Sequence, residues 1–239
     1  MSGIARYRPL FLGTQPAHLH PPYASSIKRA PTKPLVEIPQ TLSEVTGPLF
    51  GRDEVHRGEC DLTLSPGGEA IGQRIVVSGR VLDENGRPVP HTLIEIWQAN
   101  AAGRYLHKLD QHNAPLDPNF SGEGHTLTDE QGRYRFITIR PGSYPWGNHY
   151  NAWRPAHIHL SLFGPAVATR LVTQMYFPGD PMLEFDPIFE CTADEKARRR
   201  LIAQMDWETT VPREAIGFHF NIILRGSDAT PMEDRYRRL

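Results

Sequence analysis

The sequence is poor in the features that mark several large classes of protein. It has only two cysteines, Cys60 and Cys191, which form no CxxC pattern, so it predicts neither a disulfide framework nor a cysteine-rich zinc site. It contains no run of about 18 apolar residues, the length that a membrane-spanning helix needs. Its formal net charge is −1, whereas a dedicated nucleic-acid-binding domain is usually strongly basic. The first residues lack the apolar stretch of a secretory signal, so we expect a cytoplasmic protein.

The chain is rich instead in proline, glycine and histidine, with 22, 20 and 11 residues among 239. Eight of the prolines fall in residues 1–48, where they disfavour regular helix and central strand because proline fixes φ and lacks an N–H donor. Two interpretations of this region stay open: a disordered tail, or an extended arm that buries residues such as Tyr7 and Tyr23 against a partner. We expect a proline-rich arm and lead-in over residues 1–70 and a folded domain over residues 71–239.

From residue 71 onward, short β-type runs alternate with turns. Arg74–Leu82 is rich in β-branched residues, and Asn85-Gly86 after it is a strong hairpin signal, with Thr92–Gln98 as the returning strand. A second hairpin-like unit joins His125–Thr128 to Arg133–Ile139. Three further strands are expected, at Ala156–Phe163, Ala168–Phe177 and Ile216–Arg225. The pattern predicts an all-β fold: a mixed-topology β-sandwich core with large loops.

One helix is expected in the C-terminal half. Thr192 and Glu195 have the spacing of a capping box, with Thr192 as the N-cap and Glu195 at the third helical position. Strong helix formers follow up to about Trp207,. We expect this helix to cover one end of the sandwich.

The sharpest chemical signal is the pair His157 and His159 on an expected strand. Residues two apart on a strand point to the same face, so the two imidazoles lie within reach of one metal ion. Such a pair is common and histidine has many other roles, so alone it does not establish a metal site. Tyr105 and Tyr144 are the candidate further ligands, although either could be an ordinary half-buried aromatic.

Four stretches together resemble the intradiol ring-cleavage dioxygenases. They are Glu95–Tyr105 (EIWQANAAGRY), Thr128–Phe136 (TDEQGRYRF), Pro141–Trp146 (PGSYPW) and Arg154–His159 (RPAHIH). The likeness is strongest to the β chain of the two-chain members that act on protocatechuate. Catechol-type members insert more residues between the second tyrosine and the histidines and carry a helical N-terminal region, whereas here twelve residues separate Tyr144 from His157.

The resemblance implies a non-haem Fe(III), one per αβ protomer, held by Tyr105, Tyr144, His157 and His159. Two phenolates and a hydroxide would balance the charge of this hard cation and so lower the cost of burying it. The implied activity is cleavage of protocatechuate with O₂ to 3-carboxy-cis,cis-muconate, in aromatic catabolism through the β-ketoadipate pathway. The implied partner is a homologous α chain, in a higher hetero-oligomer.

The resemblance also implies roles around the metal. Tyr144 is the ligand that leaves when the substrate binds, and Arg154 places its guanidinium beside the ring, although a surface ion pair is the plain alternative for an arginine. Gln174 is expected to hydrogen-bond Arg154. The expected substrate-binding residues are Tyr23, Trp146, Arg154 and Ile188. Trp97 is expected either near them or in the core.

Two rival functions remain open. Ser78–Pro90 and Thr128–Tyr144 also resemble transthyretin-like or carboxypeptidase-regulatory sandwich modules, which bind without iron, but that reading leaves the HxH pair unexplained. The second rival is an intradiol enzyme for another catechol, such as hydroxyquinol or a homoprotocatechuate-like acid.

Overall fold

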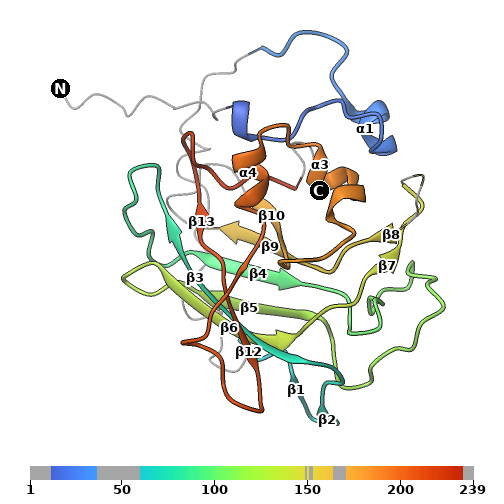
Figure 1. Cartoon of the computed structure of the whole chain (residues 1–239), viewed down its shortest axis with the longest axis vertical. Helices are drawn as coiled ribbons and strands as arrows, with labels where there is room; N and C mark the ends of the chain where they lie inside the picture. The colour runs from blue at the N-terminus through green and yellow to red at the C-terminus, as the bar shows by residue number, and fades with distance from the viewer. Residues whose placement is uncertain (1–11, 37–59, 149, 151–152, 164–170, 234–239) are drawn as a thin grey trace.

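Two sheets packed face to face form the centre of the fold (Figure 1). The computed structural model describes residues 12–36, 60–148, 150, 153–163 and 171–233. The first sheet is antiparallel, in the order β10 (Leu171–Tyr176), β9 (His157–Phe163), β4 (Leu93–Trp97) and β5 (Glu123–Leu127). The second has the order β11 (Gln204–Met205), β12 (Ile216–His219), β3 (Arg74–Leu82) and β13 (Ile222–Ile223), with β6 (Arg133–Ile139) also on β3. Because β12 and β13 run parallel to β3, the topology is mixed. The expected all-β sandwich is confirmed.

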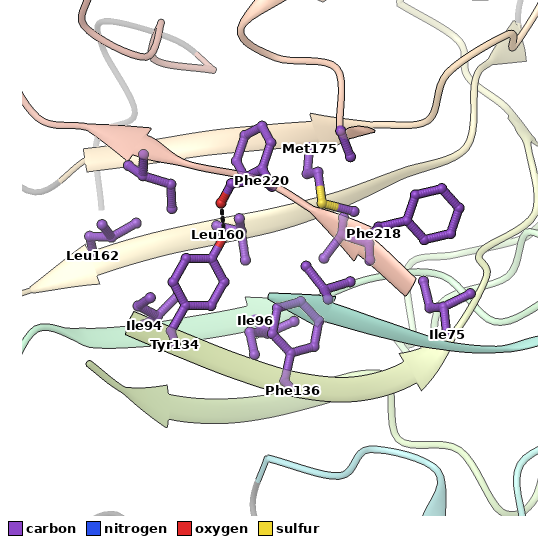
Figure 2. Close-up of a cluster of buried hydrophobic side chains, with 14 of the residues drawn as sticks. Ile75, Ile94, Ile96, Tyr134, Phe136, Leu160, Leu162, Met175, Phe218 and Phe220 are labelled. Atoms are coloured by element: carbon purple, nitrogen blue, oxygen red, sulfur yellow. Dashed lines mark hydrogen bonds between the residues drawn. The ribbon is translucent and has the colours of Figure 1, made fainter. Parts of the chain in front are cut away.

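The core lies between the sheets and follows from the two-residue period of each strand. Figure 2 shows Ile94 and Leu160 of the first sheet packed toward Phe136 and Phe218 of the second, all of them buried. Tyr134 also lies there, and its hydroxyl donates to the carbonyl of Phe220 at 2.5 Å. This bond satisfies the one polar group that the side chain brings into the core.

The outer face of the first sheet is covered as well. In β9, Ile158 and Leu160 face the core while His157 and His159 point the other way, yet all four are buried. The cover comes from η3 (Leu183–Phe185), α3 (Pro187–Glu190) and α4 (Glu195–Arg199), which lie over β9 and β10 (Figure 1). A sheet covered on both faces can hold buried polar side chains on the face away from the core.

Both expected hairpins are wrong, although both turns exist. The chain turns after β3 through a hydrogen bond between Asp83 N and Arg87 O at 2.9 Å, with Gly86 at φ 75°. However, β3 then pairs with β6, β12 and β13, whereas β4 pairs with β5 and β9. The second turn likewise leads from β5 in one sheet to β6 in the other. Each turn therefore crosses between layers, because two apolar inner faces bury more surface when they face each other.

The C-terminal half contains two short helices where one long one was expected. The N-cap of α4 is Asp194, whose carboxylate accepts from Ala197 N at 2.6 Å, and not Thr192. The helix ends at Arg199 because the chain joins the edge of β10, with Tyr176 N bonded to Leu201 O at 2.8 Å. Pairing with a sheet edge has overridden helix propensity. The expected strand Ile216–Arg225 is likewise broken into β12 and β13.

Part of the proline-rich region folds against its own chain. It contains η1 (Leu12–Thr14) and the helix α1 (Ala24–Arg29), which corrects the expectation of no regular helix. The helix fits between Pro22 and Pro31, where no proline interrupts it. Ala17 N bonds to Cys191 O at 2.8 Å, and Ser25 N bonds to Asn148 Oδ1 at 2.9 Å.

Two small ladders complete the fold, β1 (Leu64–Ser65) with β2 (Gly68–Glu69) and β7 (Tyr144–Pro145) with β8 (Trp153–Arg154). Residues 1–11 and 37–59 lie outside the described residues, as do the first three residues of the expected strand Ala168–Phe177, so those predictions stay predictions there. Among the helices of the described segments, none has the length and apolar character to cross a membrane.

Candidate functional site

The register of the first sheet gathers polar residues at one of its ends. Trp97 at the end of β4 pairs with His159 near the start of β9, and His159 pairs in turn with Gln174 on β10. His157 pairs with Tyr176 at the end of β10. Directly opposed residues on a sheet share a face, so these five side chains project together onto the covered outer face.

The two tyrosines reach the same place from loops. Tyr144 on β7 pairs with Arg154 on β8, and Tyr105 lies in the loop after β4. The two loops touch backbone to backbone at Gly103, whose φ is +78° and whose absent Cβ would lie 2.1 Å from Ser143 O. Glycine is required at that position, since a side chain there would push the loops apart.

The four predicted metal ligands come together. The ring centroids of Tyr105 and Tyr144 are 5.4 Å apart, and those of His157 and His159 are 4.8 Å apart. The two pairs adjoin, because Tyr144 is 5.4 Å from His157 and Tyr105 is 6.4 Å from His159. The described residues contain no group of three or more His, Cys, Asp and Glu side chains that could hold a metal. A metal here would therefore need the phenol oxygens as ligands.

The Tyr105 hydroxyl is buried and finds no hydrogen-bond partner among the described residues. Burial, together with the neighbouring Tyr144 phenol, raises the pKa of Tyr105 well above its usual range,. An unpaired buried hydroxyl costs free energy, and a bound cation would both supply a partner and favour the phenolate. Two phenols beside two imidazoles are donors that suit a hard, highly charged ion such as Fe(III). The residues present fit that ion.

His157 is held in the form that a metal ligand requires. Its Nδ1 lies 2.7 Å from Pro155 O, which fixes the hydrogen there,. Its Nε2 lies 3.2 Å from Tyr144 Oη and 2.9 Å from Arg154 Nη1. Burial, followed by the positive charge of Arg154, lowers the pKa of His157 well below its usual range. The ring is therefore neutral at pH 7, with its lone pair on Nε2.

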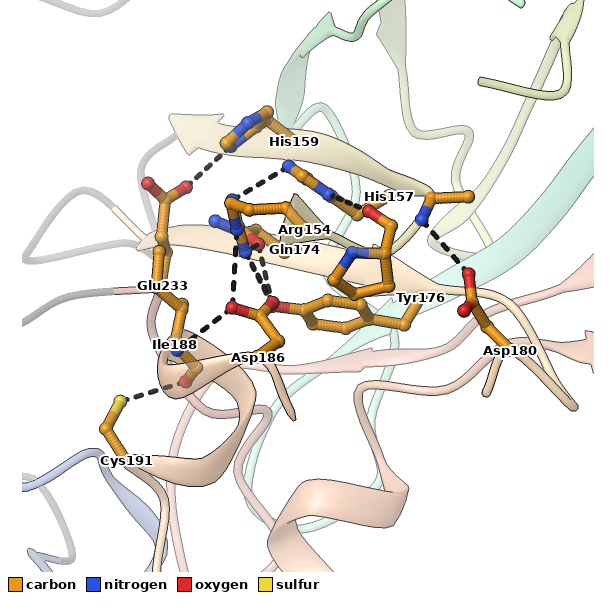
Figure 3. Close-up of polar contacts among 12 residues, drawn as sticks. Arg154, His157, His159, Gln174, Tyr176, Asp180, Asp186, Ile188, Cys191 and Glu233 are labelled. Atoms are coloured by element: carbon orange, nitrogen blue, oxygen red, sulfur yellow. Dashed lines mark hydrogen bonds and ion pairs between the residues drawn. The ribbon is translucent and has the colours of Figure 1, made fainter. Parts of the chain in front are cut away.

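Arg154 is buried at the centre of a polar network (Figure 3). Its Nη2 donates to Asp186 Oδ2 at 2.6 Å and to Gln174 Oε1 at 2.6 Å, and lies 3.1 Å from Tyr176 Oη. Burial alone would lower the pKa of Arg154, but the Asp186 carboxylate and the phenols of Tyr144 and Tyr176 hold it well above its usual range. Arg154 is thus a permanently charged group of fixed orientation, and the plain alternative of a surface ion pair is wrong.

A pocket of about 780 Å³ opens beside these groups. Most of the predicted site residues line it, namely Tyr23, Tyr105, Tyr144, Trp146, Arg154, His159 and Ile188, and Trp97 does too. His157 and Gln174 are buried in contact with Arg154. The structure therefore brings every predicted site residue together. Tyr23 and Trp146 touch at the pocket wall, with ring centroids 5.4 Å apart.

Three residues of the site were missed from the sequence: Asp186, Tyr176 and Glu233. Asp186 had a usable signal, because an Asp-Pro pair before an apolar segment is typical of a helix N-cap, and its carboxylate does accept from Ile188 N at 3.1 Å. Tyr176 could have been found as the residue two beyond Gln174 on one strand face. Glu233, which lies 2.7 Å from His159 Nδ1, carried no local signal.

Comparison with known proteins gives matches along nearly the whole chain. A family model described as "Dioxygenase" matches residues 45–226, and one described as "Protocatechuate 3,4-dioxygenase beta subunit N terminal" matches residues 7–41. The protocatechuate 3,4-dioxygenase beta chain of Burkholderia cepacia is 58% identical over 222 residues, 92% of this chain and 94% of that one. The catechol 1,2-dioxygenase of Candida albicans is 30% identical over 64% of this chain and 52% of that one.

Solved structures show the same likeness. The crystal structure of 3-chlorocatechol 1,2-dioxygenase from Rhodococcus opacus 1CP matches with a TM-score of 0.54 and 25% identity, over 75% of this chain and 70% of that chain. The chain spans nearly the full length of its Burkholderia relative, but only about half of the Candida enzyme.

Proposed function

The chain belongs to the intradiol ring-cleavage dioxygenase family, and from this premise we propose that it is the β chain of an enzyme that opens protocatechuate with O₂ to 3-carboxy-cis,cis-muconate. The observation that carries the proposal is the meeting of Tyr105, Tyr144, His157 and His159 beside one pocket. The buried Tyr105 hydroxyl has no hydrogen-bond partner among the described residues, and a bound cation would supply one,. The β-ketoadipate pathway is the proposed setting.

We propose that these four residues hold one Fe(III) per αβ protomer. When bound, Fe(III) supplies electrophilic activation of a chelated catechol toward O₂. The imidazoles offer Nε2, since each has its Nδ1 engaged by a neighbouring oxygen. A cation on His157 Nε2 would take the place of the hydrogen bond that Arg154 donates to that atom in the structure.

The protein's own groups then have defined tasks. Tyr144 Oη would be one of the oxygens that hold the iron, and it is the proposed proton acceptor for a catechol hydroxyl of the bound substrate. Arg154 keeps a positive charge beside the reacting ring, where negative charge develops during the attack on O₂. Its orientation is held by Asp186 and Gln174, both of which accept from Nη2 at 2.6 Å. We propose Tyr144, Arg154 and Gln174 as the catalytic set.

The pocket wall suits an aromatic acid. Trp146 and Ile188 are proposed to flank the ring, and Tyr23 to lie near its carboxylate. Arg29 also lines the pocket, with its guanidinium carbon 4.8 Å from the centre of the Tyr23 ring. A cation at this position favours a catechol acid over an uncharged catechol.

The proposed partner is a homologous α chain, in a higher hetero-oligomer. The second family model is named for a beta subunit, which supports a two-chain enzyme. The loop beside the pocket exposes Leu106 and Leu109, at 61% and 76%, and such apolar side chains suit burial against another chain,.

We also propose the division into an arm (1–70) and a catalytic domain (71–239), and a cytoplasmic location. Cys60 and Cys191, both in the described part, form no disulfide,.

The experiment that tests the function is an anaerobic titration of the purified αβ complex with protocatechuate, followed by visible spectroscopy. A ferric tyrosinate centre gives a visible charge-transfer band, and chelation of the substrate should shift it. Tyr105→Phe should change the band in the resting complex. Metal analysis should return one iron per αβ protomer.

Substrate identity is decided by oxygen uptake with protocatechuate, catechol and hydroxyquinol in parallel, and by ultraviolet detection of the product. We expect protocatechuate to give the highest kcat/KM and a muconate product. A faster reaction with hydroxyquinol would replace the substrate but keep the family chemistry. A colourless, iron-free complex with no oxygen uptake would overturn the proposal.

A further inference from the structure

A buried carboxylate from the C-terminal segment lies against one of the two site histidines. Glu233 Oε2 is 2.7 Å from His159 Nδ1, and both side chains are almost fully buried, at 7% and 6% exposure. The two residues are 74 positions apart in sequence, so a tertiary arrangement brings them together. Glutamate is almost never buried without a specific partner. Figure 3 shows the carboxylate directed at the His159 ring.

The segment that carries Glu233 is tied to the strand beside His159. Glu233 N donates to Val172 O at 2.8 Å, and Thr173 Oγ1 donates to Pro231 O at 2.7 Å. Both acceptor and donor belong to β10, the direct neighbour of β9. Met232 N donates to Gln15 Oε1 of the N-terminal arm at 2.9 Å. These three bonds hold the backbone of residues 231–233 in place, independently of the contact between the Glu233 carboxylate and His159.

The His159 ring is constrained in two independent ways. Trp97 stacks on it with ring centroids 4.7 Å apart and an interplanar angle of 6°, which fixes the plane of the ring. The bond to Glu233 then turns the Nδ1 edge of the ring toward the carboxylate and keeps the hydrogen on Nδ1, so that Nε2 faces away from Glu233. His157 has the equivalent arrangement, with its Nδ1 against the Pro155 carbonyl at 2.7 Å.

We propose that Glu233 is a positioning residue of the metal centre: its carboxylate accepts from His159 Nδ1 and so presents Nε2, in the correct tautomer and orientation, to the iron. The inference rests on the proposed function, because it requires a ferric centre on His159. A carboxylate that accepts from Nδ1 makes Nε2 a more basic metal ligand than a backbone carbonyl would. Such outer partners affect metal affinity in known sites. The C-terminal segment thereby becomes part of the metal centre.

The test compares Glu233→Ala and Glu233→Gln with the wild-type αβ complex and with Glu208→Ala, which removes an exposed carboxylate that does not line the pocket. The measurements are iron per protomer, the rate of iron loss to an excess of a ferric chelator, the visible band, and the unfolding temperature. We expect Glu233→Ala to lose iron about ten- to a hundredfold faster than wild type, with a shifted band. Glu233→Gln keeps an acceptor oxygen, so its rate of iron loss should lie between those of wild type and Glu233→Ala. Glu208→Ala should lose iron at the wild-type rate and keep the wild-type band.

The readouts separate this role from a merely structural one. Loosening of the C-terminal segment alone would lower the unfolding temperature but leave the band and the chelation rate of the folded fraction unchanged, and that result overturns the proposal. Should Glu233→Ala fail to fold, an unchanged chelation rate in Glu233→Gln overturns it equally. A wild-type complex that binds no iron would overturn the proposed function together with this inference, whereas normal iron retention in a Glu233 variant would overturn this inference alone.

Discussion

The buried charges around Arg154 have partners of their own. Arg154 has the carboxylate of Asp186 and the amide oxygen of Gln174, and Asp186 in turn caps α3 through Ile188 N. Each charge is thereby compensated, and each side chain loses the freedom to turn away. A buried ion pair of this kind adds little net stability, but removal of one member leaves the other uncompensated.

Asp186→Asn therefore tests how far the position of Arg154 matters. The substitution preserves the size of the side chain but removes the negative charge, so Arg154 loses its strongest acceptor. We expect a loss of up to about 3–5 kcal/mol in the free energy of unfolding. We also expect kcat with protocatechuate to fall about ten- to a hundredfold, with a smaller change in KM. Steady-state oxygen uptake and thermal unfolding of the αβ complex measure both.

Asp228→Asn is the matched control. Its carboxylate is 78% exposed and makes a surface ion pair with Arg200 at 3.6 Å, which contributes little, so kcat and stability should stay within error of wild type. Equal kcat in Asp186→Asn and Asp228→Asn would show that the network does not position Arg154 for catalysis.

The residue scale also shows what sequence alone can predict. The HxH spacing places His157 and His159 on one face of any strand, and the structure confirms that they lie together. The association of Tyr105 and Tyr144 with them came from the family resemblance, because nothing local links loops that are far apart in sequence. Glu233 could not be predicted, since its contact depends on where the chain end returns along β10.

At the scale of elements, the strands were predicted better than their pairing. Period-two patterns and turn residues located β3, β4, β6 and β9 within a few residues. The pairing was wrong because a turn such as Asp83–Gly86 fixes the local path of the chain but not the sheet that the next strand enters. Burial of both inner faces decides that, and it is a property of the whole sandwich. For the same reason, α4 ends where β10 offers an edge.

Gly103→Ala tests the contact between the two tyrosine-bearing loops. The added Cβ would lie 2.1 Å from Ser143 O, so the loops must separate and carry Tyr105 away from Tyr144. We expect loss of the visible band and of iron, together with a lower unfolding temperature. Absorption spectra and metal analysis of the αβ complex measure the first two.

Gly86→Ala is the control, because Gly86 has nearly the same φ, +75°, but nothing within 4 Å of the Cβ position. It should cost only the left-handed strain, about 1–2 kcal/mol, with iron content and spectrum unchanged. If Gly103→Ala binds iron with the wild-type spectrum, close packing of the loops is not what places the two phenols.

At the scale of the whole molecule, the sandwich explains why ionisable groups sit where they do. The first sheet keeps its core face apolar and gives its outer, covered face to the site. The second sheet places the phenol of Tyr134 in the core, where burial raises its pKa well above its usual range. Cys191, under the cover of the outer face, has its pKa raised to about 12, first by burial and then by the charge of Asp186.

Raised acid pKa values make the folded state resist proton loss. Above pH of about 9 to 10 the unfolded chain ionises its cysteine and tyrosine side chains, while the buried Tyr134 and Cys191 stay protonated. The folded state then binds more protons than the unfolded state, so the free energy of unfolding must fall as pH rises through this range. Each such group contributes a slope of about 1.4 kcal/mol per pH unit.

Tyr134→Phe isolates one of these contributions. At pH 7.5 the variant should be less stable by about 1–3 kcal/mol, because the carbonyl of Phe220 loses the hydroxyl that donates to it at 2.5 Å,. Above pH of about 10, wild type alone pays for keeping this phenol protonated, so the deficit should shrink by about 1.4 kcal/mol per pH unit and then change sign. Urea unfolding of both proteins at equal concentration from pH 7.5 to 11.5 measures it, with the contribution of Cys191 cancelling in the difference. A deficit that stays constant over that range would mean that Tyr134 ionises as easily in the folded core as in the unfolded chain.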